Sequence, residues 1–115
     1  MDPDCLFCRI VSGKLPAPLL YSDDDIVAFA DIAPQAPLHC LVVPRAHLPH
    51  LFATNASDAL VLGKMVATGT ELARRAGLEK DGFRLVWNCL AGAGQSVFHL
   101  HLHVLGGRPF SWPPG

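Results

Sequence analysis

The segment at residues 97–105 constrains the fold most, because it carries a histidine at every second position from 99 to 103. The residues between these histidines are leucine, and valine and leucine follow them. In a β-strand, successive side chains point to opposite faces of the sheet. The segment therefore predicts a strand with three imidazoles on one face and an apolar row, packed on a core, on the other.

Such a row of imidazoles has two chemical interpretations beyond an ordinary half-buried sheet face. Two histidines two positions apart on a strand can share a zinc ion with a third ligand from elsewhere, which would give a catalytic metal site. Alternatively, one imidazole acts as a nucleophile, because much of it is unprotonated near neutral pH. The zinc site explains the pattern less fully, but the residues alone leave both interpretations open.

The rest of the chain divides into two helices and four strands. Apolar residues at helical spacing predict a short helix that ends near Ser12 and Gly13 and a long helix that begins at Ser57 as its N-cap and ends at Gly77. Strand-like runs occur at 19–22, 26–31, 39–44 and 83–88. With the histidine strand, these elements predict an α+β fold: a five-stranded, mostly antiparallel sheet with one long and one short helix.

Composition limits the partners of the chain. We expect one domain, residues 1–115, with a proline-rich tail at 109–115. Charged residues make up only 17% and the mean hydropathy is +0.31, which suggests that a partner chain covers some apolar surface. A net charge of -1 at pH 7 gives no electrostatic footprint for nucleic acid, so we expect no nucleic-acid partner.

The N-terminal residues and the cysteines indicate the compartment. Acidic residues stand where a secretory signal needs a basic segment, and the longest uncharged stretch, 85–107, is interrupted by polar residues. We therefore expect a cytoplasmic protein without a membrane span. Thiols stay reduced in that compartment, so Cys5 and Cys8 are candidate metal ligands rather than a disulfide.

Three further motifs accompany the histidine segment. They are Asp-Ile-Ala-Pro-Gln-Ala-Pro at 31–37, Pro-Arg-Ala-His at 44–47 and Trp-Pro-Pro-Gly at 112–115. Together with Gln-Ser-Val-Phe-His-Leu-His-Leu-His at 95–103, they resemble the histidine triad (HIT) superfamily, specifically its Hint branch. The resemblance covers nearly the whole chain and implies that residues 1–115 adopt the HIT fold.

The resemblance implies a covalent mechanism. The middle histidine, His101, matches the nucleophile that forms a nucleotidyl-histidine intermediate at the α-phosphorus, which water then hydrolyses. A backbone carbonyl in the same segment holds the other ring nitrogen as a donor. His39 and His103 match positions that contact the phosphate and complete a polar relay, which His99 can join.

Binding residues follow from the same resemblance. The glycine-containing turn before the triad is a candidate phosphate cradle, because phosphoryl transfer needs donors aimed at phosphate oxygens. Phosphate or leaving-group contacts are implied for Asn88, Gly94, Gln95 and Ser96. The ribose hydroxyls are implied to bind Asp31, and a purine is implied to lie in an apolar slot formed by Phe7, Ile10, Phe29 and Ile32.

A structural zinc site is also implied. A subset of HIT proteins holds zinc with a cysteine pair, the histidine of Pro-x-x-His and the first triad histidine, which here are Cys5, Cys8, His47 and His99. His50 is a possible substitute for His47. Four such ligands make a closed site that stabilises a small domain and does no chemistry, so we expect no cofactor for catalysis.

The predicted function is hydrolysis of purine nucleoside phosphoramidates, such as AMP joined to an amine, by a homodimer whose sheets join edge to edge. The Trp-Pro-Pro-Gly end is expected to reach toward the partner's site. One alternative is a nucleotide-binding or interaction protein whose hydrolysis is incidental. Another is a dinucleoside polyphosphate hydrolase, a branch that lacks this end. Nucleotidyl transferases carry Gln at the third triad position, where this chain has His103.

Overall fold

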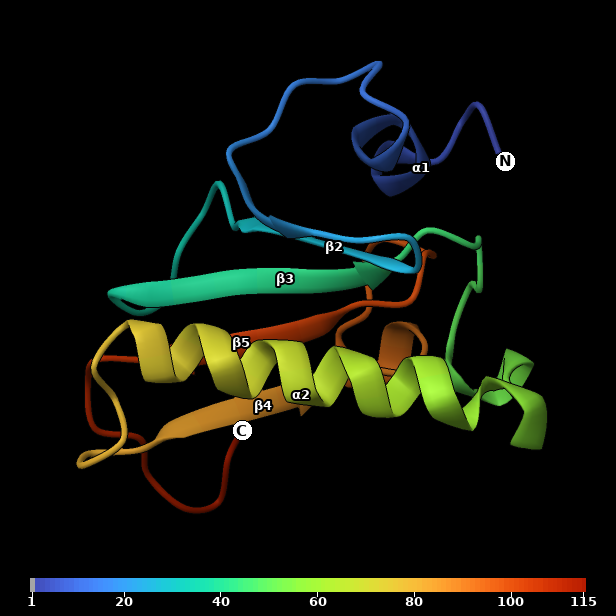
Figure 1. Ribbon diagram of the computed structural model, residues 1–115. Coiled ribbons are helices and arrows are strands. Elements are labelled where there is room, and N and C mark those ends of the chain that lie inside the picture. The colour runs from blue at the N-terminus through green and yellow to red at the C-terminus, as the bar shows by residue number, and fades with distance from the viewer. Residues whose placement is uncertain (1) are drawn as a thin grey trace.

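The computed structural model describes residues 2–115 and consists of one five-stranded sheet between two helices of unequal length (Figure 1). The strand order is β1-β2-β3-β5-β4, and every neighbouring pair is antiparallel. The fold thus has the predicted α+β class. Its elements are α1 (Leu6–Val11), β1 (Leu19–Ser22), β2 (Ile26–Ala30), β3 (Leu38–Pro44), α2 (Ala59–Arg75), β4 (Phe83–Trp87) and β5 (Leu102–Gly106).

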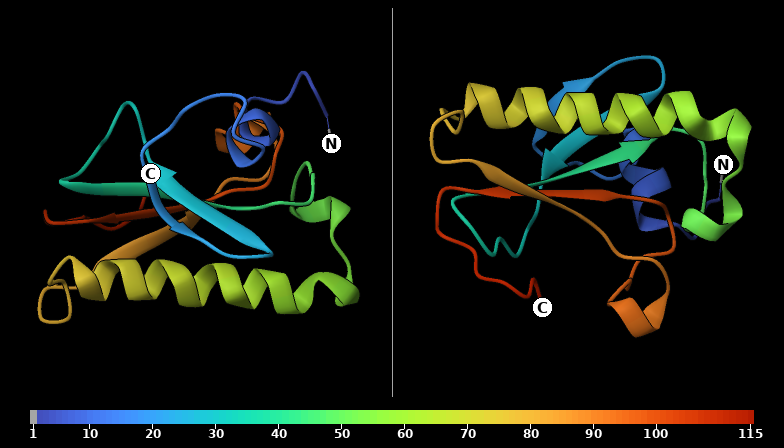
Figure 2. Two further views of the ribbon diagram at one scale, coloured as in Figure 1. Left: turned by 45° about the horizontal axis from the view of Figure 1, so that its top comes forward. Right: turned by 90° about the horizontal axis from the view of Figure 1, so that it is seen from below.

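The two faces of the sheet have different partners. Alternate residues of β2 and β3 belong to the core that includes residues of α2, while the residues between them pack with α1. The two helices lie on opposite sides of the sheet (Figures 1 and 2). The long helix lies close to the sheet at Gly69, where an added Cβ would come within 2.9 Å of a Val104 methyl carbon. The face toward α2 is an apolar core, built around Cys40, Val42, Met65, Leu72, Leu100, Leu102 and Val104. The opposite face is left to form the functional site.

The start of α2 differs from the prediction. Ser57 is not its N-cap but lies inside a 3₁₀-helix, η2 (Ala56–Asp58), that leads into α2. The side chain of Asn55 accepts the Ser57 N–H, and the Asp58 carboxylate accepts the Asn55 N–H, which makes a reciprocal capping box. The predicted end is correct, since Gly77 takes a φ of +79° just after the helix.

The histidine strand is shorter than predicted. β5 begins only at Leu102, opposite Val42, and residues 97–101 leave the sheet. The cause is a competing partner, since the Leu100 N–H donates to the carbonyl of Leu48 in the loop after β3. Side chains still alternate there: Leu100 joins the core toward α2, whereas His99 and His101 point to the other side.

In the described part of the chain, no helix is both long enough and apolar enough to cross a membrane.

Candidate active site and metal centre

A cavity of about 530 Å³ opens between α1 and the sheet. Its size suits a small organic ligand. Its walls come from α1, the segment 15–18, the end of β2, the loop after β4 and the triad segment. All but one of the predicted nucleotide-binding residues line it: Phe7, Ile10, Phe29, Asp31, Ile32, Asn88, Gly94, Ser96, His101 and His103.

His101 is held by a backbone carbonyl, as the resemblance implied. Its Nδ1 lies 2.8 Å from the carbonyl oxygen of His99. Because that oxygen can only accept, the Nδ1–H of His101 donates and the lone pair of a neutral ring is on Nε2. Burial lowers the pKa of His101 below its usual value. The side chain therefore presents a neutral, nucleophilic nitrogen at a wall of the cavity.

A second pair of histidines has a defined proton pattern. The Gln35 N–H donates to Nδ1 of His39 at 3.0 Å, so a neutral His39 carries its proton on Nε2. That Nε2 lies 3.0 Å from Nδ1 of His103 and 3.3 Å from the Asp31 carboxylate. Nδ1 of His103 therefore accepts, and its own proton is on Nε2. Burial, followed by the neighbouring His101, lowers the pKa of His103 to about 4, so the ring is neutral.

Three backbone amides of the turn before the triad are already used within the turn and are not free to form a phosphate cradle. Its 3₁₀-helix, η3 (Ala91–Ala93), is followed by Gly94 with a φ of +95°. The N–H groups of residues 93, 94 and 95 all donate to carbonyls of Leu90 or Ala91. Contacts from this loop to a phosphate are therefore left to other groups, and the candidates that line the cavity are Ser96, with its backbone N–H and hydroxyl, and the side chain of Asn88.

Gln95 is the predicted binding residue that does not line the cavity. Its side chain is buried and bonds only backbone: Oε1 accepts the Leu90 N–H, and Nε2 donates to the carbonyls of Pro49 and Val97. The Leu90 residue that it holds has a φ of +73°, which is strained for a branched side chain. Gln95 thus shapes the loop instead of contacting a ligand.

The apolar slot is partly core and partly surface. Phe7 and Phe29 are buried and pack edge to face with ring centroids 5.4 Å apart. Ile32, by contrast, is 96% exposed at the mouth, so it is not an extension of the core. Beside it, one Asp31 oxygen accepts the Ala33 N–H and the other faces His39. The segment 15–18 and Leu41 complete the walls, and no chemical signal in the sequence pointed to these apolar residues.

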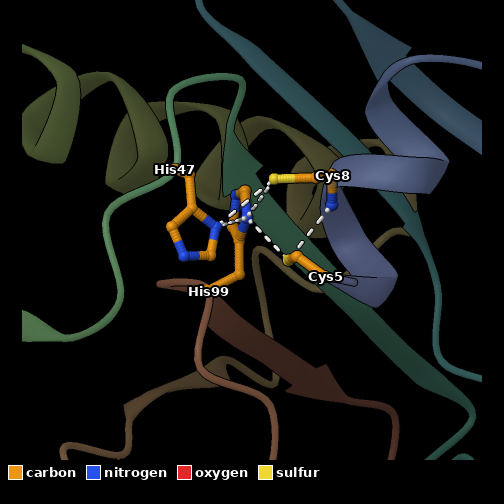
Figure 3. A group of neighbouring side chains, drawn as sticks. All are labelled: Cys5, Cys8, His47 and His99. Carbon is orange, nitrogen blue, oxygen red and sulfur yellow. Dashed lines mark hydrogen bonds between the residues drawn. The ribbon is translucent and has the colours of Figure 1, made fainter. Parts of the chain in front are cut away.

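The four predicted metal ligands meet in one cluster (Figure 3). Cys5 and Cys8 come from the start of α1, His47 from the loop after β3 and His99 from the triad segment. Their donor atoms all lie within 4.8 Å of one another. The alternative ligand, His50, is not part of the cluster.

The donor set fits a tetrahedral zinc ion. The two histidine Nδ1 atoms are 3.2 Å apart, and Nδ1 to Sγ distances are 3.3 to 3.5 Å. Ligands at normal zinc bond lengths and tetrahedral angles are about 3.3 to 3.6 Å apart. The Nε2–H of His99 donates to the Pro44 carbonyl at 2.7 Å, which turns the Nδ1 lone pair toward the cluster. Burial raises the pKa of the Cys5 thiol, a cost that a bound cation would offset.

This arrangement separates the three triad histidines. His99 is fully buried in the metal cluster and does not line the cavity, so its predicted membership in the catalytic group is not supported. His101 and His103 face the cavity. In residues 2–115 no two triad histidines belong to one donor group, because His99 is grouped with Cys5, Cys8 and His47 and His103 with Asp31 and His39, which argues against a catalytic zinc shared by two of them.

Comparisons with known proteins show the family of the chain and agree with its fold. The HIT domain family matches residues 12–110. An uncharacterized HIT-like protein of Synechocystis is 49% identical over 115 residues, the full length of both chains. A HIT family hydrolase from Legionella pneumophila is 45% identical, with a TM-score of 0.95 over 97% of this chain and 100% of that one.

A second similar solved structure contains zinc. It is a zinc-bound histidine triad family protein from Mycobacterium smegmatis, 36% identical, with a TM-score of 0.82 over 97% of this chain and 80% of that one. The family match spans most of the sequence, and these likenesses extend over nearly all of it. This chain therefore belongs to the HIT family.

Proposed function

We propose that this chain is a purine nucleoside phosphoramidate hydrolase of the Hint branch, which releases AMP or a related monophosphate from an amine. The observation that carries the proposal is the orientation of His101, whose Nδ1–H is bonded to the His99 carbonyl while the ring lines a ligand-sized cavity. The description of the Legionella pneumophila protein as a hydrolase supports the reaction class. The Trp-Pro-Pro-Gly end favours phosphoramidates over dinucleoside polyphosphates.

The reaction has two displacements. Nε2 of His101 attacks the α-phosphorus, the phosphorus–nitrogen bond to the amine breaks, and the amine leaves with a proton. Water then attacks the same phosphorus and breaks its bond to His101, which yields the monophosphate and the free imidazole. His103 carries its proton on Nε2 and lines the cavity, so it is a candidate hydrogen-bond donor to a phosphate oxygen, while the leaving amine takes its proton from solvent water. The side chains of Ser96 and Asn88 bind phosphate oxygens.

Nucleoside recognition uses the outer part of the cavity. The purine lies between the aromatic rings of Phe7 and Phe29 and the aliphatic side chains of Ile10 and Ile32. Asp31 is half-exposed at the cavity wall and accepts both ribose hydroxyls. The slot selects a flat ring by its apolar surface, so we expect little preference between adenine and guanine.

The metal cluster is proposed as a structural zinc site formed by Cys5, Cys8, His47 and His99. Two thiolates and two imidazoles form a closed site, and zinc bound there would stabilise the domain without taking part in bond breaking. The donor spacing and the zinc-bound relative support the assignment. The catalytic steps above use none of its ligands as reacting groups.

We further propose that residues 1–115 form a single domain in a cytoplasmic homodimer. β4 lies at one edge of the sheet, so a second copy can extend the sheet there and remove the exposed edge. In the tail, Trp112 is 85% exposed. That exposure is consistent with a tail that reaches toward the site of the partner.

The test compares wild type with His101→Ala on an adenosine phosphoramidate, with and without a chelator, by following AMP release. We expect release by wild type that survives chelation and falls by several orders of magnitude in the variant, while AMP still binds both. AMP binding without release would favour the nucleotide-binding protein. Release abolished by chelation would favour a catalytic metal, and faster cleavage of a dinucleoside polyphosphate would move the chain to that branch.

A further inference from the structure

One short helix carries both metal ligands and cavity residues. In α1, the cluster receives Cys8 and, from the N-cap position, Cys5, while Phe7 and Ile10 line the cavity. Figure 1 shows that α1 stands on the face of the sheet opposite α2, between the N-terminal segment and the long connection to β1. The position of α1 therefore sets both the metal cluster and one wall of the cavity.

The helix α1 is attached to the rest of the fold at both ends and along its length. At its C-terminal end, the Arg45 guanidinium donates to the Val11 carbonyl. Along its length, Phe7, Cys8 and Val11 pack on apolar residues of β2 and β3. At its N-terminal end, Cys5 and Cys8 meet His99 and His47, which come from segments far away in the chain (Figure 3). Without a cation, these contacts are only weak thiol–imidazole hydrogen bonds.

The cluster also reaches the nucleophile. The His99 ring is fixed at both nitrogens, by the Pro44 carbonyl and by the cluster. The main-chain carbonyl of the same residue accepts the Nδ1–H of His101. In addition, the Phe7 ring packs edge to face on His101, with centroids 5.1 Å apart. A change in the cluster thus reaches the cavity by two routes, through the wall and through the acceptor of the nucleophile.

We propose that metal occupancy and nucleotide binding are energetically coupled in this chain, with Cys5 and Cys8 acting as positioning residues for the nucleotide site. The inference rests on the proposed function, since it assumes that the cavity binds a nucleotide. Zinc in the cluster fixes α1 and raises the affinity of the cavity for AMP. Coupling between two binding sites is reciprocal, so bound AMP raises the affinity for zinc by the same factor.

The coupling is measurable in both directions. In the first direction, AMP affinity is measured by calorimetry on reduced protein, loaded with zinc or stripped by chelator and checked for folding by circular dichroism. We expect AMP to bind about tenfold more tightly to the loaded protein, within the usual range of coupling between sites. In turnover measurements, removal of zinc should raise KM, because α1 forms one wall of the cavity. It should also lower kcat, because the His99 carbonyl orients His101. A purely stabilising metal, well below the melting temperature, would change none of these values.

In the second direction, zinc release from the loaded protein is followed with a chromogenic chelator, with and without saturating AMP. An adjoining cleft of about 330 Å³, which shares Leu6, Ser96 and Val97 with the cavity, reaches Cys5 and His47 and gives the chelator a route to the metal. We expect AMP to slow release several-fold in wild type and to have little effect in Asp31→Ala, whose ribose contact is removed. This measurement does not require the metal-free protein to be stable. A control with zinc, AMP and chelator but no protein corrects for zinc that AMP itself binds.

Cys5→Ser provides the matched variant. Cys5 is the N-cap of α1, and its sulfur accepts the Cys8 N–H at 3.3 Å. Serine keeps this cap but is a poor zinc ligand. Its AMP affinity should equal that of stripped wild type and not respond to zinc, whereas Cys5→Asp, which both caps the helix and can bind zinc, should restore part of the response. Cys89→Ala, outside the cluster, should respond to zinc like wild type.

Equal AMP affinity in the loaded and stripped proteins would overturn the coupling and leave the proposed function intact. An absence of AMP binding in both forms would overturn both proposals. Failure of the chain to bind zinc would overturn the coupling, and a zinc response in Cys5→Ser as large as that of wild type would remove the cysteines from it.

Discussion

Gln95 connects three backbone segments through one side-chain amide. Its side chain accepts the N–H of Leu90 and donates to the carbonyls of Pro49 and Val97. Gln95 does not line the cavity. The loop that carries Asn88 and Ser96 therefore owes its shape to a residue that the family resemblance suggested as a ligand contact. Its effect on a substrate would be indirect.

We predict that Gln95→Met destabilises the protein and loosens the loop. Methionine has a similar length but leaves the three backbone groups without partners, and each buried unpaired group costs about 1 to 3 kcal/mol. The free energy of unfolding in urea should fall by about 3 kcal/mol or more, and KM for the phosphoramidate should rise. Gln35→Met is the matched control, because its side-chain bond to the Ala33 carbonyl is exposed. Equal effects of the two substitutions would contradict this role.

For individual residues, the sequence indicated which side chains belong to the site better than it indicated what each of them does there. The acceptor on Nδ1 of His101 is where the resemblance placed it. The role of Gln95 was not predictable, because an amide can bind either a ligand or the fold itself. For His99 the resemblance implied two roles, zinc ligand and member of the polar relay, and the structure places its ring among the metal ligands. The Gln35 N–H that fixes His39 is a backbone group and has no signature in the sequence.

The close packing of α2 on the sheet depends on a glycine, Gly69. At Gly69 the long helix approaches β5 so closely that a methyl group would contact Val104 at 2.9 Å, Leu85 at 3.4 Å and Leu102 at 3.7 Å. Gly63 lies in the same helix with nothing within 4 Å of an added Cβ. The two glycines therefore form a natural comparison within α2.

We predict opposite effects for the two alanine substitutions. Gly69→Ala should lower the free energy of unfolding by about 1 to 3 kcal/mol, because overpacking outweighs the better helix propensity. Gly63→Ala should raise it by up to about 1 kcal/mol, because only the propensity changes. Urea denaturation of both variants is the measurement. Stabilisation by Gly69→Ala would show that the helix can move away from the sheet at no cost.

Helices and strands were predictable because their apolar periodicity is local. The strands of the first hairpin, the third strand and both helices lie close to their predicted ranges. The two errors arise from contacts that no local pattern records. Leu100 bonds the loop after β3 and thereby ends β5 early, and the box of Asn55 with Asp58 replaces Ser57 as the cap before α2. The order of the strands is equally non-local and did not follow from the sequence.

For the molecule as a whole, the buried triad predicts sensitivity to acid. Burial and neighbouring histidines lower the pKa of His103 from 6.5 to about 4 in the folded state. Between these values the unfolded chain binds a proton that the folded chain does not, so stability is full above about pH 6.5 and falls as the pH drops toward 4. One such group contributes about 1 kcal/mol per pH unit across this window.

The measurement is urea denaturation at several pH values in wild type and His103→Gln. Glutamine does not titrate, so the slope of unfolding free energy against pH should be smaller in the variant by about 1 kcal/mol per unit. The comparison uses slopes, so a change in overall stability does not affect it. Parallel slopes would mean that His103 is protonated in the folded protein over the same range as in the unfolded chain.

The ligands of the metal cluster lie far apart in the sequence. Its ligands come from positions 5, 8, 47 and 99, and periodicity could not join them. Only the resemblance predicted that they meet, whereas the contacts of α1 and of His99 from which we infer the coupling became visible in the structure.

The acceptor that orients His101 belongs to the main chain, and this protects it from mutation. Every amino acid at position 99 supplies a carbonyl, so no codon change can delete the group itself. A saturation mutagenesis screen for activity should therefore find variants that lose the reacting imidazole, or that shift the backbone, but none that simply remove its partner. In an enzyme whose reacting histidine is oriented by a carboxylate side chain, a single amino-acid substitution can remove the orienting acceptor. Such an enzyme has one more position at which a substitution abolishes activity.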